Sequence, residues 1–401
     1  MSGTGAGDDD RGFSTRAIHE GDVPVEIAEQ PVAPPIWLSA HFVYDGLDHY
    51  ADVINERRDG FVYGRYGTPT HAALHKVLAS LDGAPAAWSF ASGMAAIHTA
   101  LTAMVSSGDH VVAARTVYGG TYALLTSIFP GYGIDATFAD SEADAIDAAI
   151  RDTTRAVVIE PLANPTFRVA DVRGIAAVCA ERGVLLVVDN SVASPFLLRP
   201  LEIPGVGLVV HSTSKYIAGH ADLIGGSVAG PHDLVDRIRH LAIEQGTTAG
   251  AFDAWLVLRG LPTMALRLER QCANAMALAD ALREHPKVTS VGYSGLPDHP
   301  DHERAAALFD GGRFGAMLAF ELDGGYDAAA RWASALRIAC VGSSFGGLRT
   351  EVCHPATTSH RQFSPADRAA AGIGDGLIRV SAGAEDANDL VQDFTRALEK
   401  A

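Results

Sequence analysis

The chain has 401 residues, of which 48% are hydrophobic, and its formal net charge is −17. This length allows two or three domains with sizeable cores. The net negative charge argues against a nucleic-acid partner, because binding to the phosphate backbone needs a positively charged surface and the sequence has no cluster of Lys and Arg that would form one. No apolar run approaches the ~20 residues that span a bilayer, so we expect a cytoplasmic protein without a membrane partner.

Residues 1–62 are predicted to form a tail and an extended arm. The opening MSGTGAGDDDRG is small, polar and acidic, unlike a signal or transit peptide, and is expected to be frayed. The Pro-interrupted stretch QPVAPPIWLSAHFVYD then predicts little regular structure. We expect this arm to lie on a larger body.

The next part of the chain alternates between helical and strand-like stretches. THAALHKVLASLDG has helical periodicity, and a short apolar run ending at Phe90 leads into the turn and helix ASGMAAIHTALTAM. The further strand candidates are HVVAA, RAVVIE, VLLVVDN and GLVVHST, with the helical stretches SEADAIDAAIRD and DVRGIAAVCAERG among them. This alternation predicts an α/β fold with a mainly parallel central sheet and helices on both faces.

A long helical stretch, FDAWLVLRGLPTMALRLERQCANAMALADALREH, is expected to bridge to a C-terminal α+β domain that contains GAMLAFEL and GLIRVSAG. We place the boundary at residue 260, which gives an α/β domain over 63–260 and a C-terminal domain over 261–401. The four cysteines are widely separated and form no CxxC pair, as expected for isolated thiols in a reducing compartment. The histidines show no HExxH or other metal spacing, so we predict no structural metal.

Chemistry-bearing residues follow the predicted strands at their carboxyl ends, where ligands bind in such sheets. Ser92, Gly93 and Met94 stand at a strand-to-helix turn, whose free N–H groups and positive helix end would bind a phosphate, although such a turn is often only a tight turn. Glu160 and Asp189 also close strand candidates. Asp189 would either cap a turn or face the protonated pyridine nitrogen of a pyridoxal ring.

Lys215 lies between an apolar run and a glycine-containing polar loop, in VVHSTSKYIAGHADLIGG. It could be a surface lysine that closes a strand. In an apolar setting it would instead lose hydration, which lowers its pKa and frees the amine for a Schiff base with an aldehyde. Ser212 and Ser214 would add hydrogen bonds to the phosphate. Together with the residues above, this order predicts a pyridoxal 5'-phosphate site.

The motifs identify a family resemblance over almost the whole chain after the tail. The chain resembles the Cys/Met-metabolism family of pyridoxal-phosphate enzymes in YGRYGTPT, FASGMAAI, VYGGTY, EPLANP, VVDNSVASP, STSKYIAGHADLIGG, FDAWLVLRGL, HPATTSH and GLIRVSAGAED. The resemblance implies a fold-type I transferase whose residues 63–260 bind the cofactor. It also implies small-molecule amino-acid substrates.

The resemblance implies roles for further residues. Tyr118 would stack on the pyridine ring and move protons. Tyr63 and Arg65 would reach the cofactor phosphate of a neighbouring subunit, which implies a homo-oligomer with shared sites, at least a dimer and expected to be a tetramer built as a dimer of dimers. Arg379 would hold the substrate carboxylate. Asn164 would touch the cofactor or that carboxylate, and Ser344 would lie in the substrate-contacting segment.

Departures from the family pattern bear on the substrate. Gly120 stands where methionine γ-lyases typically carry cysteine, and Arg349 stands where cystathionine enzymes commonly carry glutamate. A cation there would favour a distal carboxylate over a distal ammonium. The alternative is a surface arginine paired with Glu351. HPATTSH is more similar to homoserine sulfhydrylases.

The implied activity is γ-elimination or γ-replacement on a sulfur-containing or O-activated homoserine-type amino acid. Lys215 would remove the α-proton, and the ring held by Asp189 would stabilise the carbanion. The alternatives are an aminotransferase, which would exchange amino groups stoichiometrically, a cystathionine β-lyase, or a non-catalytic descendant, which would lack the visible absorbance of a bound cofactor.

Overall fold

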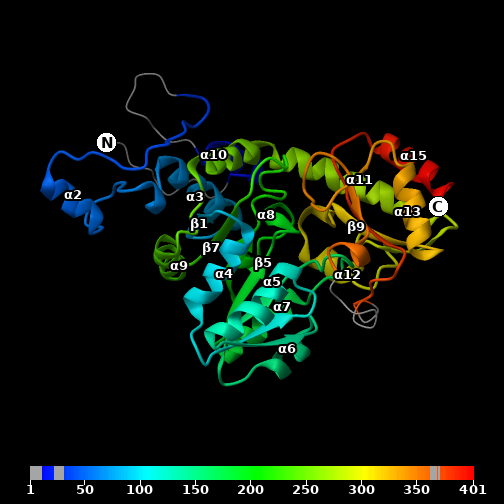
Figure 1. The fold of residues 1–401 in the computed structure, drawn as a ribbon, viewed down its shortest axis with the longest axis horizontal. Helices are drawn as coiled ribbons and strands as arrows, with labels where there is room; N and C mark the ends of the chain where they lie inside the picture. The colour runs from blue at the N-terminus through cyan, green and yellow to red at the C-terminus, as the bar shows by residue number, and fades with distance from the viewer. Residues whose placement is uncertain (1–10, 22–30, 362–367, 369–370) are drawn as a thin grey trace.

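The computed structural model describes residues 11–21, 31–361, 368 and 371–401. The acidic tail over 1–10 and part of the predicted arm, 22–30, lie outside the described residues. Two β-sheets with their helices lie side by side, and the N-terminal arm and the C-terminus lie at opposite ends of the molecule (Figure 1). No helix in these described ranges is both long and apolar enough to cross a membrane.

The larger sheet contains the predicted strand-to-helix units. Its strands lie in the order β1-β7-β6-β5-β4-β2-β3, and within this sheet only β7 runs against its neighbours. The predicted mainly parallel sheet is therefore confirmed. The strands are β1 (Ala86–Phe90), β2 (His110–Ala114), β3 (Asp135–Ala139), β4 (Thr154–Ile159), β5 (Leu185–Asp189), β6 (Val206–His211) and β7 (Gly226–Gly230).

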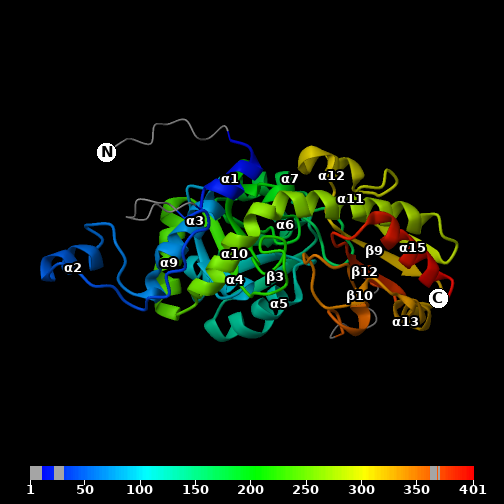
Figure 2. The ribbon, with the colours of Figure 1, turned by 90° about the horizontal axis from the view of Figure 1, so that it is seen from above.

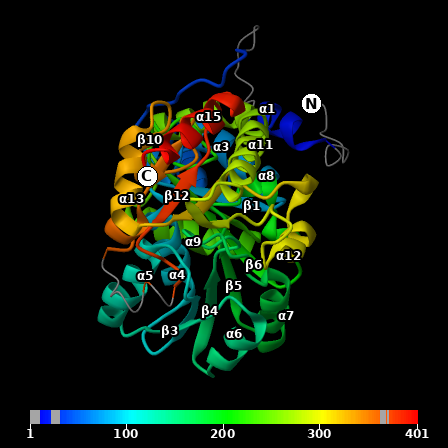
Figure 3. The same ribbon diagram turned by 90° about the vertical axis from the view of Figure 1, so that its right-hand side faces the viewer.

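Helices cover both faces of this sheet, as predicted. Figure 3 shows α4 and α5 on one side of the strands and α6 and α7 on the other. The helices up to α10 are α1 (Phe13–His19), α2 (Leu47–Ile54), α3 (Pro69–Asp82), α4 (Gly93–Met104), α5 (Gly119–Ala123), α6 (Ala143–Ala149), α7 (Val172–Arg182), α8 (Ser194–Leu197), α9 (His232–Gln245) and α10 (Ala251–Gly260). The β-branched runs of β2, β4 and β5 are buried between these layers, which is why they read as continuous apolar segments.

The smaller sheet belongs to the C-terminal part and is mainly antiparallel, in the order β10-β11-β12-β9-β8. Its elements are β8 (Val288–Gly292), β9 (Met317–Leu322), β10 (Cys340–Val341), β11 (Glu351–Cys353) and β12 (Leu377–Ser381), with α11 (Met264–Arg283), α12 (His302–Leu308), α13 (Gly325–Ala335) and α15 (Ala387–Leu398). The α+β expectation is confirmed. The division at residues 62 and 260 stays a prediction.

Two segments differ from the sequence expectation. The long bridging helix is two helices, α10 and α11, joined by a 3₁₀ turn over Leu261–Thr263. Pro262 explains this break, because proline supplies no backbone N–H. The arm also contains two short helices, α1 and α2, and Figure 2 shows α2 standing away from the body of the molecule.

Candidate active site

Lys215 meets two residues of the C-terminal part. The lysine follows β6 and is half-buried. Its Nζ donates a hydrogen bond to Ser344 Oγ at 2.8 Å and lies 4.8 Å from the centre of the Phe345 ring. Arg379 Nη2 donates to the Ser344 carbonyl, also at 2.8 Å. Three predicted site residues from distant parts of the chain therefore lie together.

The surroundings of Lys215 favour its neutral amine. Burial lowers the pKa of Lys215, the positive charge of Arg379 lowers this pKa further, and the carboxylate of Glu351 opposes both. The lowered pKa of Lys215 that the sequence predicts from desolvation is therefore found in the structure. A lysine with a lowered pKa is suited to attack an aldehyde and to accept a proton.

Arg379 lies on β12 and is only 3% exposed. Its Nε is buried and has no hydrogen-bond partner among the described residues. A buried guanidinium with an unused donor is costly unless an anion binds it. This arrangement fits a carboxylate ligand beside Lys215.

A candidate anion site lies at the start of α4. Ser92 caps this helix, and its Oγ accepts a hydrogen bond from Ala95 N at 3.0 Å. A Cβ at Gly93 would lie 2.8 Å from Ser212 Cβ, so only glycine lets the helix end approach the segment before Lys215. The backbone N–H groups at this positive helix end are suited to an anion.

Ser212 and Ser214 differ in their surroundings. Ser212 lies against Gly93, and its backbone N–H donates to Ser191 Oγ at 2.6 Å. The Ser214 hydroxyl bonds instead to the backbone N–H and carbonyl of Gly225, at 2.9 and 3.2 Å, and so serves its own loop. A phosphate contact by Ser214 stays a prediction.

Tyr118 is held near the same helix by a glycine. A Cβ at Gly120 would lie 2.5 Å from the Tyr118 ring and 2.7 Å from Met94 Sδ. Tyr118 and Met94 therefore both lie next to the place that a side chain at position 120 would occupy, and Tyr118 is 54% exposed. A cysteine at position 120, as in methionine γ-lyases, would force this tyrosine to move.

Two carboxyl groups lie at the ends of β4 and β5. Burial and the nearby Asp189 raise the pKa of Glu160 well above its usual value, although the Tyr118 backbone N–H that it accepts opposes this shift. Burial also raises the pKa of Asp189, whose Oδ1 accepts from Ser191 N at 3.0 Å. A buried carboxyl with a raised pKa is a fitting partner for a cation such as a protonated pyridine nitrogen.

Asn164 lies in a loop that leads from β4, and its Oδ1 is buried without a partner among the described residues. The loop is anchored by Asp301, which accepts from Arg168 and from the Val169 N–H. An unused buried amide oxygen is the observation expected where a polar ligand group completes the site.

The residues present fit pyridoxal phosphate on these three counts: the glycine-lined helix end, the raised pKa of Asp189 and the unused oxygen of Asn164.

Three predicted residues are not brought to this cluster within one chain. The guanidinium of Arg65 bonds to the Ile243 carbonyl in α9, which lies on the far side of the large sheet from the C-terminal domain (Figure 1). Tyr63 packs on Tyr66 and is 46% exposed. Arg349 is exposed, and Glu351 accepts a hydrogen bond from Ser344 N instead of pairing with it.

The sequence reasoning missed two contributors. Glu351 is linked to Lys215 through Ser344, whereas the sequence suggests it only as a partner of Arg349; the meeting of these three residues leaves no local signal in the sequence. Arg267, on α11 and 5% exposed, donates to the carbonyls of Tyr216, Ile217 and Gly260 at 2.9, 3.3 and 3.0 Å. Burial lowers the pKa of Arg267 to about 10, so it stays charged at neutral pH.

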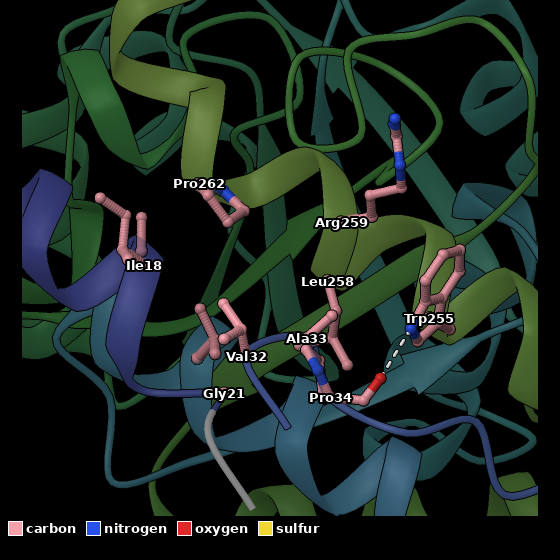
Figure 4. A pocket seen from close by; sticks show the side chains of 11 residues that line it. Ile18, Gly21, Val32, Ala33, Pro34, Trp255, Leu258, Arg259 and Pro262 are labelled. Atoms are coloured by element: carbon pink, nitrogen blue, oxygen red, sulfur yellow. Dashed lines mark hydrogen bonds between the residues drawn. The ribbon is translucent and has the colours of Figure 1, made fainter. Parts of the chain in front are cut away.

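A separate pocket of about 220 Å³ lies between the arm and α10. Figure 4 shows Val32, Ala33 and Pro34 of the arm facing Leu258 and Pro262, with Trp255 Nε1 donating to the Pro34 carbonyl at 2.8 Å. The walls are mainly apolar and contain none of the predicted site residues. This pocket therefore lies apart from the cluster around Lys215.

Known proteins are similar to this chain in sequence and fold. Residues 14–399 match the family "Cys/Met metabolism PLP-dependent enzyme". The chain is 36% identical to L-methionine gamma-lyase of Porphyromonas gingivalis, over 97% of each chain, and 40% identical to O-succinylhomoserine sulfhydrylase of Pseudomonas aeruginosa, over 96% of this chain and 95% of the relative. The crystal structure of metB from Corynebacterium glutamicum superposes with a TM-score of 0.90 at 36% identity, covering 98% of each chain. The chain therefore belongs to the Cys/Met metabolism PLP-dependent enzyme family.

Proposed function

We propose that this protein binds pyridoxal 5'-phosphate covalently through Lys215 and catalyses γ-elimination or γ-replacement on a sulfur-containing or O-activated homoserine-type amino acid. The meeting of Lys215, Ser344 and Arg379 is the observation that carries this proposal. It supports the proposal because an amine with a lowered pKa lies near a buried guanidinium that could bind a carboxylate. The named activities of the relatives, a methionine lyase and a homoserine-ester sulfhydrylase, lie within the same reaction class.

The proposed cofactor site uses residues from the strand ends. The α4 end with Ser92, Gly93 and Met94, together with Ser212, would hold the phosphate, and Ser214 is the remaining predicted donor. Tyr118 would cover the ring, Asn164 would bond to a polar group on it, and Asp189 would pair with its nitrogen. When bound, the cofactor supplies an electron sink for the carbanion formed at Cα.

The chain's own residues would then handle binding and protons. Arg379 would fix the substrate carboxylate by a charge-assisted pair, which orients the α-hydrogen. Lys215, with its lowered pKa, would accept the proton from Cα and hold it near Ser344. Loss of a proton from Cβ and of the group on Cγ follows in both reaction types, so the branch depends on whether water or a nucleophile completes the turnover.

The site is proposed to be completed by a second copy of this chain, in a dimer or a dimer of dimers. The arm supports this proposal, because Val43 and Leu47 are 93% and 86% exposed. Apolar side chains gathered on a projecting segment are typical of an interface. Tyr63 and Arg65, which lie after this segment, would contact the partner's cofactor.

The first experiment is a substrate panel of methionine, cystathionine, cysteine and O-acetyl- and O-succinylhomoserine, each with and without a thiol. Production of 2-oxobutyrate would identify γ-elimination, and a thioether product would identify γ-replacement. Lys215→Ala should abolish turnover while the far-UV circular dichroism stays unchanged. Near-native activity in this variant would remove Lys215 from the mechanism. Stoichiometric exchange of the amino group with an added 2-oxo acid, without 2-oxobutyrate or a thioether, would identify an aminotransferase.

A further inference from the structure

A carboxylate that no motif predicted lies at the lysine. Glu351 is the first residue of β11 and is half-buried. Its Oε2 accepts a hydrogen bond from Ser344 N at 3.2 Å. Ser344 also accepts from Lys215 Nζ through Oγ and from Arg379 Nη2 through its carbonyl. Ser344 is therefore hydrogen-bonded to the carboxylate of Glu351, to the amine of Lys215 and to the guanidinium of Arg379.

The charged groups facing Lys215 come from two neighbouring strands. Arg379 on β12 lowers the pKa of Lys215, and Glu351 on β11 raises it. Two other titratable groups lie close to this pair. Burial raises the pKa of Cys353, while burial followed by the charge of Arg379 lowers the pKa of His360, so both are neutral near pH 7. Glu351 thus supplies the negative charge of this cluster.

We propose that Glu351 is a positioning residue for Lys215: its carboxylate fixes Ser344 and provides the counter-charge that keeps the protonated amine beside the Ser344 hydroxyl. The proposal rests on the proposed role of Lys215 as the group that accepts the α-proton. The proton passes from Cα to Nζ, and the resulting ammonium lies close to Arg379. A nearby anion offsets that like-charge repulsion, and the face of the Phe345 ring adds to the attraction.

A neighbouring glutamate provides a matched control. Glu385 also anchors this segment through hydrogen bonds, accepting from Thr350 N at 2.6 Å and from Thr350 Oγ1 at 2.8 Å. Thr350 and Glu351 are consecutive in an extended segment, so their side chains lie on opposite faces. Glu385 therefore supports the loop from the face away from Lys215, and it is half-buried like Glu351.

The deciding variant is Glu351→Gln, which keeps an oxygen acceptor for the Ser344 N–H and removes the charge. The first measurement uses the full-length protein freed of cofactor: the rate of Lys215 acetylation by acetic anhydride is followed against pH by peptide mass spectrometry. We expect the pKa of Lys215 to fall by about one unit, because an opposite charge nearby favours the ammonium. Glu385→Gln should leave this pKa unchanged, and Glu351→Asp should restore most of it.

The second measurement follows kcat against pH in the cofactor-loaded protein, where the limb that depends on Lys215 should move in the same direction in Glu351→Gln. An unshifted Lys215 titration in Glu351→Gln would overturn the proposal, even if activity fell, because it would leave Glu351 only as a loop anchor. If Glu351→Gln does not fold, equal titrations for wild type and Ser344→Ala would overturn it instead, since the hydroxyl would then not hold the amine. If the substrate panel gives no product but the pKa of Lys215 still falls in Glu351→Gln, the proposed function is refuted and the positioning role of Glu351 is not.

Discussion

Two inactive variants of this protein should restore activity when their subunits are mixed. Arg65→Ala removes the guanidinium proposed to reach the partner's cofactor, and Lys215→Ala removes the amine. Within one chain, Arg65 is bonded to the Ile243 carbonyl on α9, whereas Lys215 faces Ser344 of the C-terminal domain. We therefore expect these two residues to serve different copies of the site.

The expected recovery follows from symmetry. Random reassociation of equal amounts gives half mixed dimers, and each mixed dimer has one site with both residues intact and one site with neither. The mixture should therefore regain about one quarter of the wild-type activity per site. A tetramer made of two such dimers gives the same fraction.

The assay is turnover of the best substrate from the panel after the two variants are co-expressed with different affinity tags and purified through both tags. This selection enriches the mixed dimers, in which about half of the sites are intact. A mixture of Lys215→Ala with Asp189→Asn is the control, because both residues belong to the same chain's site and no intact site can form. Absence of recovery with Arg65→Ala, in dimers shown to be mixed, would refute the shared site.

Asp189→Asn should keep the geometry but slow α-proton exchange by about two orders of magnitude or more, because the neutral amide no longer favours a protonated ring nitrogen; deuterium exchange at Cα measures this, and an unchanged rate would count against the role. Because Arg349 is exposed, Arg349→Glu should shift relative kcat/KM from O-succinylhomoserine toward cystathionine by about five-fold at most, since a solvent-exposed ion pair contributes about 0–1 kcal/mol, and an unchanged ratio would make Arg349 a surface residue with no role in specificity. Burial alone would raise the pKa of Asp301, but the hydrogen bonds from Arg168 and from the Val169 N–H hold it below its usual value. This stabilisation is present above the unfolded pKa near 4 and is lost as pH falls through the lower folded value. The melting temperatures of wild type and Asp301→Asn should therefore differ at pH 7 and converge in acid, once Asp301 is protonated in the folded protein; a difference independent of pH would contradict the ion pair.

The site residues that could be predicted are those that depend on local order along the chain. Asp189 and Lys215 follow β-branched runs, and such runs are recognisable because strands buried on both faces carry few polar residues. Ser92 precedes a glycine at a strand-to-helix turn, which is also a local pattern. Continuous apolar runs followed by polar residues therefore indicate the carboxyl edge of the sheet.

Features that depend on contacts between distant segments could not be predicted. The strand β7, GSVAG, has the composition of a loop, but its glycines are needed for close packing: a Cβ at Gly226 would lie 2.3 Å from the Ser92 carbonyl oxygen. Glu351 comes near Arg379 because β11 pairs with β12, and it is linked to Lys215 because Ser344 bonds to both residues. In both cases the partner lies far along the chain, and a single sequence does not show which segments meet.

The buried Arg267 mechanically couples the two halves of the molecule. Arg267 lies in the first turn of α11, and its guanidinium donates hydrogen bonds to the carbonyls of Tyr216 and Ile217. These two residues directly follow Lys215. Rotation of the C-terminal domain about this helix would thus carry the segment after Lys215 along, unless these two buried hydrogen bonds broke.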